Sequence, residues 1–178
     1  MTNDDRPATR KYARIERERR FALDALPAGV DPADYERLCD LYVEGTELRL
    51  RRVEAPDGAR LQVKLGQKTL DPQAPDDPRH RQMTTLYLRE GDERALAALG
   101  GRRSVKRRYK LAEQGWTFCI DVYEAPAGAA GTMLCEVECD SDAELERIAC
   151  PIWATREITE DARYSGFTLA GLGDEPGP

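Results

Sequence analysis

The chain has 178 residues, of which 40% are hydrophobic and 34% charged, and its formal net charge is -6. This length suits one domain with a sizeable core, and the acidic balance argues against general binding to nucleic acid, which favours a basic surface. The sequence has no apolar run of the roughly 20 residues that cross a bilayer and no signal-peptide pattern at its start. We therefore expect a soluble cytoplasmic protein.

Cysteine and histidine are arranged in a way that excludes several kinds of site. The five cysteines include no CxxC pair, and the one histidine is His80. An odd number of thiols favours neither a disulfide framework nor a thiolate zinc site, so reduced and mostly buried cysteines are expected. A single histidine excludes a multi-histidine metal site and leaves Ser-His-Asp catalysis with one poorly placed candidate.

Seven segments are predicted to be β-strands, several of them separated by turn signals such as those at residues 55–58 and 100–101. In chain order they are residues 13–21, 46–54, 60–68, 83–90, 104–112, 116–125 and 132–140. Because many of the strands follow one another directly, they predict an α+β fold, in which helices pack on the outside of an antiparallel sheet or barrel.

Helices are predicted to be fewer and shorter. Capping signals place them at residues 31–40, where Asp31 and Pro32 begin the segment, at residues 92–100, and at residues 141–149, where Ser141 and Glu144 form a capping-box pattern. A fourth is expected within residues 159–170. Residues 1–10 and 171–178 are expected to be disordered tails, which leaves one domain over residues 11–170.

Charged residues alternate with apolar residues in most of the predicted strands, and the strands differ in the sign of their charge. Basic residues share one face of residues 46–54, 60–68 and 104–112, whereas acids share one face of residues 132–140. A half-buried sheet with a solvated charged face is the ordinary explanation for one such strand. A solvated face usually mixes residue types, however, and segregation by sign is what a site for a metal and a polyanion requires. Charged faces that meet across a barrel interior would form such a site.

Short motifs follow one another between about Lys11 and Ala170: I-E-R-E-R-R-F, L-R-L-R, V-K-L, V-K-R-R-Y, I-D-V-Y, L-C-E-V-E and E-I-T-E-D-A-R-Y. In this order they resemble the CYTH superfamily, also called triphosphate tunnel metalloenzymes, whose signature is ExExK near the N-terminus. Arg20 stands at the position of the signature lysine. The resemblance implies a closed eight-stranded antiparallel barrel that forms a tunnel, with helices outside it, and Mg2+ or Mn2+ as the cofactor.

The resemblance also implies roles for individual residues. Carboxylates are expected to hold the metals, at positions Glu16, Glu18, Glu136, Glu138 and Asp121, the last of which orients a basic residue or touches a second metal. The triphosphate is expected to be bound by Arg20, Arg49, Arg51, Lys64, Lys106 and Arg108. Among these, catalysis is assigned to Glu16, Glu18, Arg20 and Lys106. Tyr42 matches a family tyrosine near the tunnel, and Glu157 and Tyr164 are expected to pack a helix on the barrel.

One departure from the family bears on activity. Many small members carry glutamates at alternate positions of the strand that here contains Met83 and Thr85. The leading hypothesis is a metal-dependent triphosphatase that hydrolyses the terminal phosphate of inorganic triphosphate or of a related compound. An adenylyl cyclase that converts ATP to cyclic AMP, and a non-catalytic polyphosphate or nucleotide receptor, are the alternatives. The expected partner is a small triphosphate-containing molecule, with no nucleic-acid polymer and no membrane, and the chain is expected to be a monomer or a homodimer.

Overall fold

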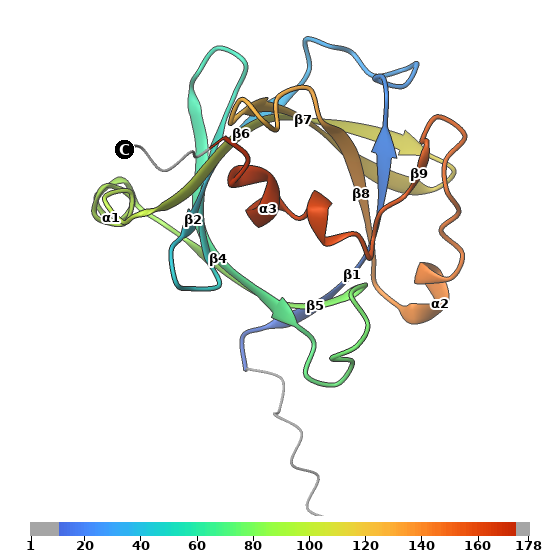
Figure 1. Cartoon of the computed structure of the whole chain (residues 1–178), viewed down its shortest axis with the longest axis horizontal. Helices are drawn as coiled ribbons and strands as arrows, with labels where there is room; N and C mark the ends of the chain where they lie inside the picture. The colour runs from blue at the N-terminus through green and yellow to red at the C-terminus, as the bar shows by residue number, and fades with distance from the viewer. Residues whose placement is uncertain (1–10, 174–178) are drawn as a thin grey trace, which may run out of the picture.

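The computed structural model describes residues 11–173, and these residues form a closed eight-stranded antiparallel β-barrel (Figure 1). Around the barrel the strands lie in the order β1, β5, β4, β3, β2, β6, β7 and β8, and β8 pairs with β1 again. The bounds are β1 (Arg14–Leu23), β2 (Glu36–Val43), β3 (Leu48–Glu54), β4 (Arg60–Leu70), β5 (His80–Tyr87), β6 (Gly101–Glu113), β7 (Trp116–Ala125) and β8 (Met133–Cys139). The predicted barrel is confirmed.

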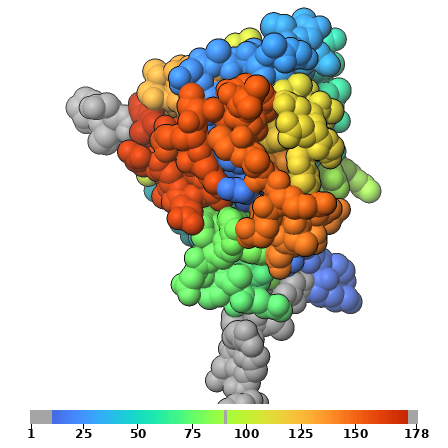
Figure 2. Space-filling view, turned by 90° about the vertical axis from the view of Figure 1, so that its right-hand side faces the viewer, coloured from blue at the N-terminus to red at the C-terminus, as the bar shows by residue number. Residues whose placement is uncertain are grey.

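The remaining elements are short and occupy different places around the barrel. They are α1 (Glu90–Leu96), α2 (Asp142–Leu145), the two-residue strand β9 (Arg156–Glu157), the 3-10 helix η1 (Ala162–Tyr164) and α3 (Gly166–Ala170). In Figure 1, α1 and α2 lie outside the wall, whereas α3 lies within the outline of the ring, across one end of the barrel. The C-terminal segment, orange to red in Figure 2, covers most of the blue N-terminal strand. None of the helices within residues 11–173 has the length and apolar character of a membrane span.

The barrel carries most of its hydrophobic core on the outside of its wall. One cluster surrounds Phe21 and Ile120 and includes Leu145 of α2. A second cluster, around Leu41 and Leu50, is covered by the region of α1. Because side chains alternate along a strand, burying the apolar residues outside turns the charged residues toward the interior. The predicted arrangement, in which the charged faces of the strands meet across the barrel interior, is therefore present.

The helix predicted at residues 31–40 is wrong. Asp31 accepts a hydrogen bond from the backbone N–H of Ala33 at 2.9 Å, but it does so in a turn. From Glu36 onward the chain forms β2, which pairs with β3 on one edge and with β6 on the other. Backbone pairing on both edges, together with burial of Leu38 and Leu41, outweighs a local capping signal.

Other predicted elements hold with shifted ends. Ser141 caps α2 by accepting a hydrogen bond from the N–H of Glu144, although the helix ends at Leu145. The segment predicted as a fourth helix divides into η1 and α3. Of the predicted tails, residues 1–10 and 174–178 lie outside the described residues, and residues 171–173 form a turn after α3.

The five cysteines are free, as predicted, but the expectation that most are buried is wrong. Cys135 is buried, Cys150 is exposed, and the other three are half-buried. The reason for one of them is the inverted barrel itself. Cys119 pairs in register with Glu136, so it lies on the inner, polar side of the wall.

Candidate metal and triphosphate site

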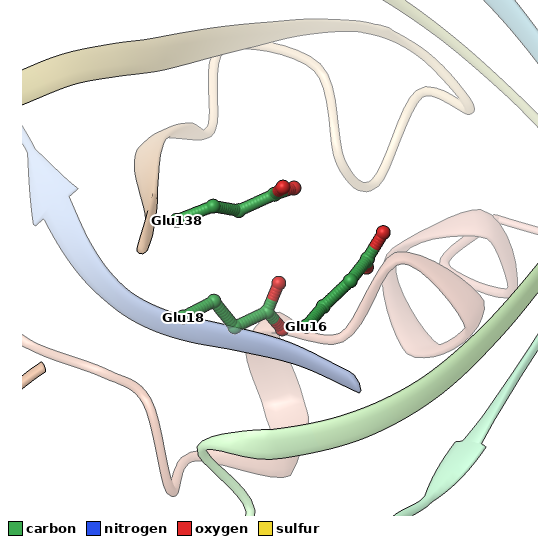
Figure 3. Close-up of side chains that lie close together, drawn as sticks. All are labelled: Glu16, Glu18 and Glu138. Atoms are coloured by element: carbon green, nitrogen blue, oxygen red, sulfur yellow. The ribbon is translucent and has the colours of Figure 1, made fainter. Parts of the chain in front are cut away.

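Three glutamates come together on one wall of the barrel (Figure 3). Glu16 and Glu18 are two residues apart on β1 and share a face, while Glu138 of β8 lies in register with Glu18. Their carboxylate oxygens lie within 4.8 Å of one another. Burial and the neighbouring Glu16 raise the pKa of Glu138 above its usual value. Mg2+ and Mn2+ take oxygen ligands, so this donor set fits such a cation.

Lys68 contacts this cluster and was missed by the sequence analysis. Its Nζ lies 2.6 Å from Glu18 Oε2 and 3.3 Å from Glu16 Oε2. Burial opposes the charge on Lys68, but the attraction of nearby glutamates outweighs it and raises the pKa of the ammonium. The period of two along β4 was the available signal, because Lys64, Gly66 and Lys68 share one face.

The opposite wall is basic and is fixed in part by Asp40. Arg51 donates two hydrogen bonds to Asp40, at 2.6 and 2.7 Å, and both side chains are buried. Burial alone would raise the pKa of Asp40, but Arg51 and then Arg49 outweigh it and hold that pKa well below its usual range. Asp40 was not predicted as a site residue, because its segment was assigned to a helix.

Asp121 holds a second group of basic residues. It accepts hydrogen bonds from Lys106 at 2.5 Å and from Arg108 at 2.7 Å, and its side chain is fully buried. Arg108 also donates to Glu136 at 2.9 Å. Of the five carboxylates assigned to metal, the structure thus brings three together and places Asp121 and Glu136 against bases. This position suits the orienting role that the sequence analysis gave to Asp121 as one of two possibilities.

Lys64 has a different environment from the other bases. Among residues 11–173 the structure gives it no ion pair, and its side chain is half-buried. Burial, followed by repulsion from Arg51 and Arg49, lowers the pKa of this lysine. A lysine among arginines is stabilised when an anion binds between them, because the anion offsets both desolvation and repulsion.

Two cavities occupy the barrel interior and meet at Met83. The wider one, of about 540 Å³, brings the acidic and the basic wall together, since its lining includes Glu16, Glu138, Arg49, Arg51, Lys64 and Arg108. The narrower one, of about 240 Å³, lies beside α3. Met83 lines both cavities and is buried, and a Cβ added to Gly66 would come within 2.9 Å of its Cε. Arg49, Lys68 and Glu136 also line both cavities. Thr85 lines the wider one.

Specific contacts hold α3 and the chain before it at one end of the barrel. Arg20 donates hydrogen bonds to the carbonyl oxygens of Thr159 at 2.8 Å and Tyr164 at 3.1 Å. A Cβ on Gly166 would come within 2.0 Å of the Tyr42 hydroxyl, so glycine is what lets α3 lie directly on this tyrosine. Tyr42 and Arg20 both line the narrow cavity.

Glu157 and Tyr164 lie away from the interior. Glu157 pairs with Arg19 on the outer face of β1, and the Tyr164 hydroxyl accepts a hydrogen bond from Arg156 at 3.1 Å. The first contact joins the C-terminal segment to β1, whereas the second is made within that segment. These positions agree with the packing role expected for the two residues.

No protein-family model and no curated protein matches the chain. Solved structures do match. The crystal structure of the inorganic triphosphatase NE1496 is 24% identical, covers 91% of this chain and 97% of its own, and has a TM-score of 0.57. A crystal structure of the hypothetical protein NE1496 is likewise 24% identical, over 87% and 97% of the two chains, with a TM-score of 0.56.

A conserved hypothetical protein from Pyrococcus furiosus is 14% identical over 90% of this chain and 93% of its own, with a TM-score of 0.51. At these identities the likeness concerns the fold, which extends over nearly the whole of each chain. The closed antiparallel barrel and the inward charges were established above without these relatives. The chain therefore has the closed antiparallel barrel that its sequence motifs predict, and it shares this fold with the inorganic triphosphatase NE1496.

Proposed function

We propose that the chain is a metal-dependent triphosphatase that hydrolyses the terminal phosphate of inorganic triphosphate or of a related small triphosphate. One observation carries this proposal: a cluster of glutamates and a wall of arginines and lysine line the same cavity of about 540 Å³. A polyanion together with its metal needs both signs of charge at once. The fold shared with an inorganic triphosphatase supports the choice of substrate.

The proposed metal ligands are Glu16, Glu18 and Glu138, which fit a hard divalent cation by their oxygen donors and their spacing. When bound there, Mg2+ or Mn2+ would polarise a phosphoryl oxygen and lower the pKa of a bound water. The protein's own part is to hold the carboxylates together. β1 and β8 do this by their register, which places Glu18 opposite Glu138.

The basic residues of the opposite wall bind the phosphates in this proposal. Arg49, Arg51 and Lys64 face the wide cavity, and Lys64 supplies a charge that forms no ion pair among residues 11–173. Arginine presents a planar fork that matches phosphate oxygens, and lysine presents a compact charge. Binding the triphosphate here relieves the repulsion among these cations.

Leaving-group stabilisation is assigned to Arg108 and Lys106. Asp121 fixes both side chains before substrate arrives, because its carboxylate holds each of them at 2.7 Å or less. Such preorganised cations stabilise the negative charge that develops on departing pyrophosphate without reorganising during the reaction. Asp121 is thus proposed as a positioning residue rather than a metal ligand.

The proposal is tested by measuring phosphate release from inorganic triphosphate, ATP and thiamine triphosphate with Mg2+ or Mn2+. We expect turnover of inorganic triphosphate that chelation of the metal abolishes. Glu18→Gln should lower this rate by on the order of 100-fold or more, because it removes one negative ligand. Glu160→Gln, at an exposed position outside the barrel, is the matched control and should leave the rate unchanged. If none of the three substrates is hydrolysed, the proposal that the chain is an enzyme is wrong.

A non-catalytic triphosphate receptor is the second candidate, and Met83 favours it. This buried thioether stands where many family members carry a glutamate, so the tunnel has fewer acids to activate water. Tight calorimetric binding of triphosphate without phosphate release would support the receptor. In the same assays, formation of cyclic AMP from ATP would instead identify a cyclase.

A further inference from the structure

Lys68 places a positive charge directly against the carboxylates proposed to hold the metal. Its Nζ is 2.6 Å from Glu18 and 3.3 Å from Glu16. β4 and β5 pair so that Lys68 lies opposite Met83, and both side chains line the two cavities. The ammonium is therefore between the acidic cluster and the space proposed for phosphates.

The acidic cluster needs a counter-charge when no metal is present. Three carboxylates whose oxygens lie within 4.8 Å would otherwise repel one another strongly in a partly buried site. Arg14 contacts Glu16 at 2.6 Å, but its side chain is 71% exposed, so water screens much of its charge. Lys68 is 31% exposed, and its charge is the less screened of the two.

We infer that Lys68 competes with the metal for Glu16 and Glu18 and that, once displaced, it binds the triphosphate, so that metal and triphosphate binding are coupled. This inference rests on the proposed function. Lys68 and a divalent cation cannot both contact the same carboxylates at full strength, because like charges repel. The freed ammonium is already at the wall of the wide cavity, where a phosphate oxygen is its natural partner.

The coupling has a defined sign. Without metal, Lys68 is held by glutamates and contributes little to triphosphate binding. With metal, the cavity gains a cation and triphosphate binds more tightly. Coupling free energies are reciprocal, so triphosphate must strengthen metal binding by the same factor, typically 5- to 150-fold.

The test compares wild type with Lys68→Met by calorimetry, using Mn2+ alone and then the preformed Mn2+ complex of a methylene-bridged, uncleavable triphosphate analogue. We expect the variant to bind Mn2+ alone about tenfold more tightly, because a competing charge is gone. The same variant should bind the Mn2+–analogue complex about tenfold more weakly, because one phosphate contact is lost. If Lys68 had only a structural role, Lys68→Met would weaken both the binding of Mn2+ alone and the binding of the Mn2+–analogue complex.

Two further variants separate the explanations. Lys64→Met should weaken binding of the complex without tightening Mn2+, since Lys64 does not contact the glutamates. Lys68→Arg should restore the wild-type pattern. Equal Mn2+ affinity in wild type and Lys68→Met would overturn the inference alone, whereas no Mn2+ binding in either would overturn it together with the proposed metal site. If Lys68→Met and Lys68→Gln both fail to fold, Lys68 is a structural counter-ion and the inference is wrong.

Discussion

Two groups of carboxylates stand in the same barrel and are neutralised in opposite ways. The anchoring acids, Asp40 and Asp121, are completely inaccessible and are held by bases at 2.7 Å or less. The cavity acids, Glu16, Glu18 and Glu138, lie close to one another, and the bases that contact them are the partly exposed Lys68 and the largely exposed Arg14. A carboxylate that points into the barrel is therefore not necessarily a metal ligand. The basic side chains around an acid decide whether it fixes the wall or remains able to take a cation.

The largest expected effect comes from breaking an anchor. Asp121→Asn leaves the buried Lys106 without its counter-charge and Arg108 with Glu136 alone, and removing one partner of a buried ion pair typically destabilises by about 3–5 kcal/mol. Urea denaturation should show this loss in the free energy of unfolding. Lys110→Met is the control, because Lys110 pairs with Glu36 on the surface and such pairs contribute about 1 kcal/mol or less. Similar losses in the two variants would contradict the distinction.

The anchors also predict how stability depends on pH. Arg51 outweighs burial and depresses the folded-state pKa of Asp40, so its contribution is complete above the unfolded pKa of about 3.9. As pH falls below that value, the Asp40 carboxylate is protonated in the unfolded chain but not in the folded chain. The free energy of unfolding therefore falls by about 1.4 kcal/mol per pH unit for this group. In Asp40→Asn this slope should be smaller by that amount. Denaturant titrations between about pH 3 and 2, below the unfolded pKa, measure this slope, and an unchanged slope would count against the anchoring role.

Lys64 of the basic wall tests the same distinction between side chains that stabilise the barrel and side chains that bind a ligand. Lys64→Met should lower affinity for triphosphate by about tenfold, the value of one charge-assisted contact. It should not lower the melting temperature, because Lys64 forms no ion pair among residues 11–173 and its charge is repelled by Arg51. Lys110→Met, on an exposed lysine of the same sheet, is the control for affinity. A drop in melting temperature with unchanged affinity would show that Lys64 is structural.

The smallest expected effect on folding belongs to the cavity acids. Glu18→Gln should change the free energy of unfolding by less than about 1 kcal/mol, because the lost contact to Lys68 is offset by relief of repulsion among the glutamates and Glu16 still pairs with the lysine. Urea denaturation without metal measures this. A loss as large as that of Asp121→Asn would place Glu18 among the anchors.

The barrel was predictable because its pattern repeats in most of the strands. Alternation alone places Glu16 and Glu18 on one face of β1, whichever strands pair with it. The segregation of acids and bases into different strands then indicates that the charged faces of these strands meet. The order of the motifs resembles that of the CYTH superfamily, and this resemblance predicted that the sheet closes into a barrel. These features depend on local geometry, and local geometry is encoded within a few residues.

Other parts of the site depend on contacts between distant segments. Asp31 and Pro32 favoured a helix, and this hid Asp40 in a strand whose pairing with β3 and β6 no local signal reveals. Lys68 was overlooked because Gly66 interrupts the run of charges on its face. The separation of Asp121 from the glutamate cluster follows from which bases lie nearest, and sequence spacing does not specify that.

The end of the barrel beside α3 is narrowed but not sealed. Gly166 lies against Tyr42, and Arg20 is held by the carbonyl oxygens of Thr159 and Tyr164. The narrow cavity at this end is nevertheless lined in part by the exposed residues Glu47 and Phe167, so it reaches the surface beside α3. The interior is therefore reached from two unequal sides. A bulky group attached to a triphosphate has more room in the cavity of about 540 Å³ than in the cavity of about 240 Å³.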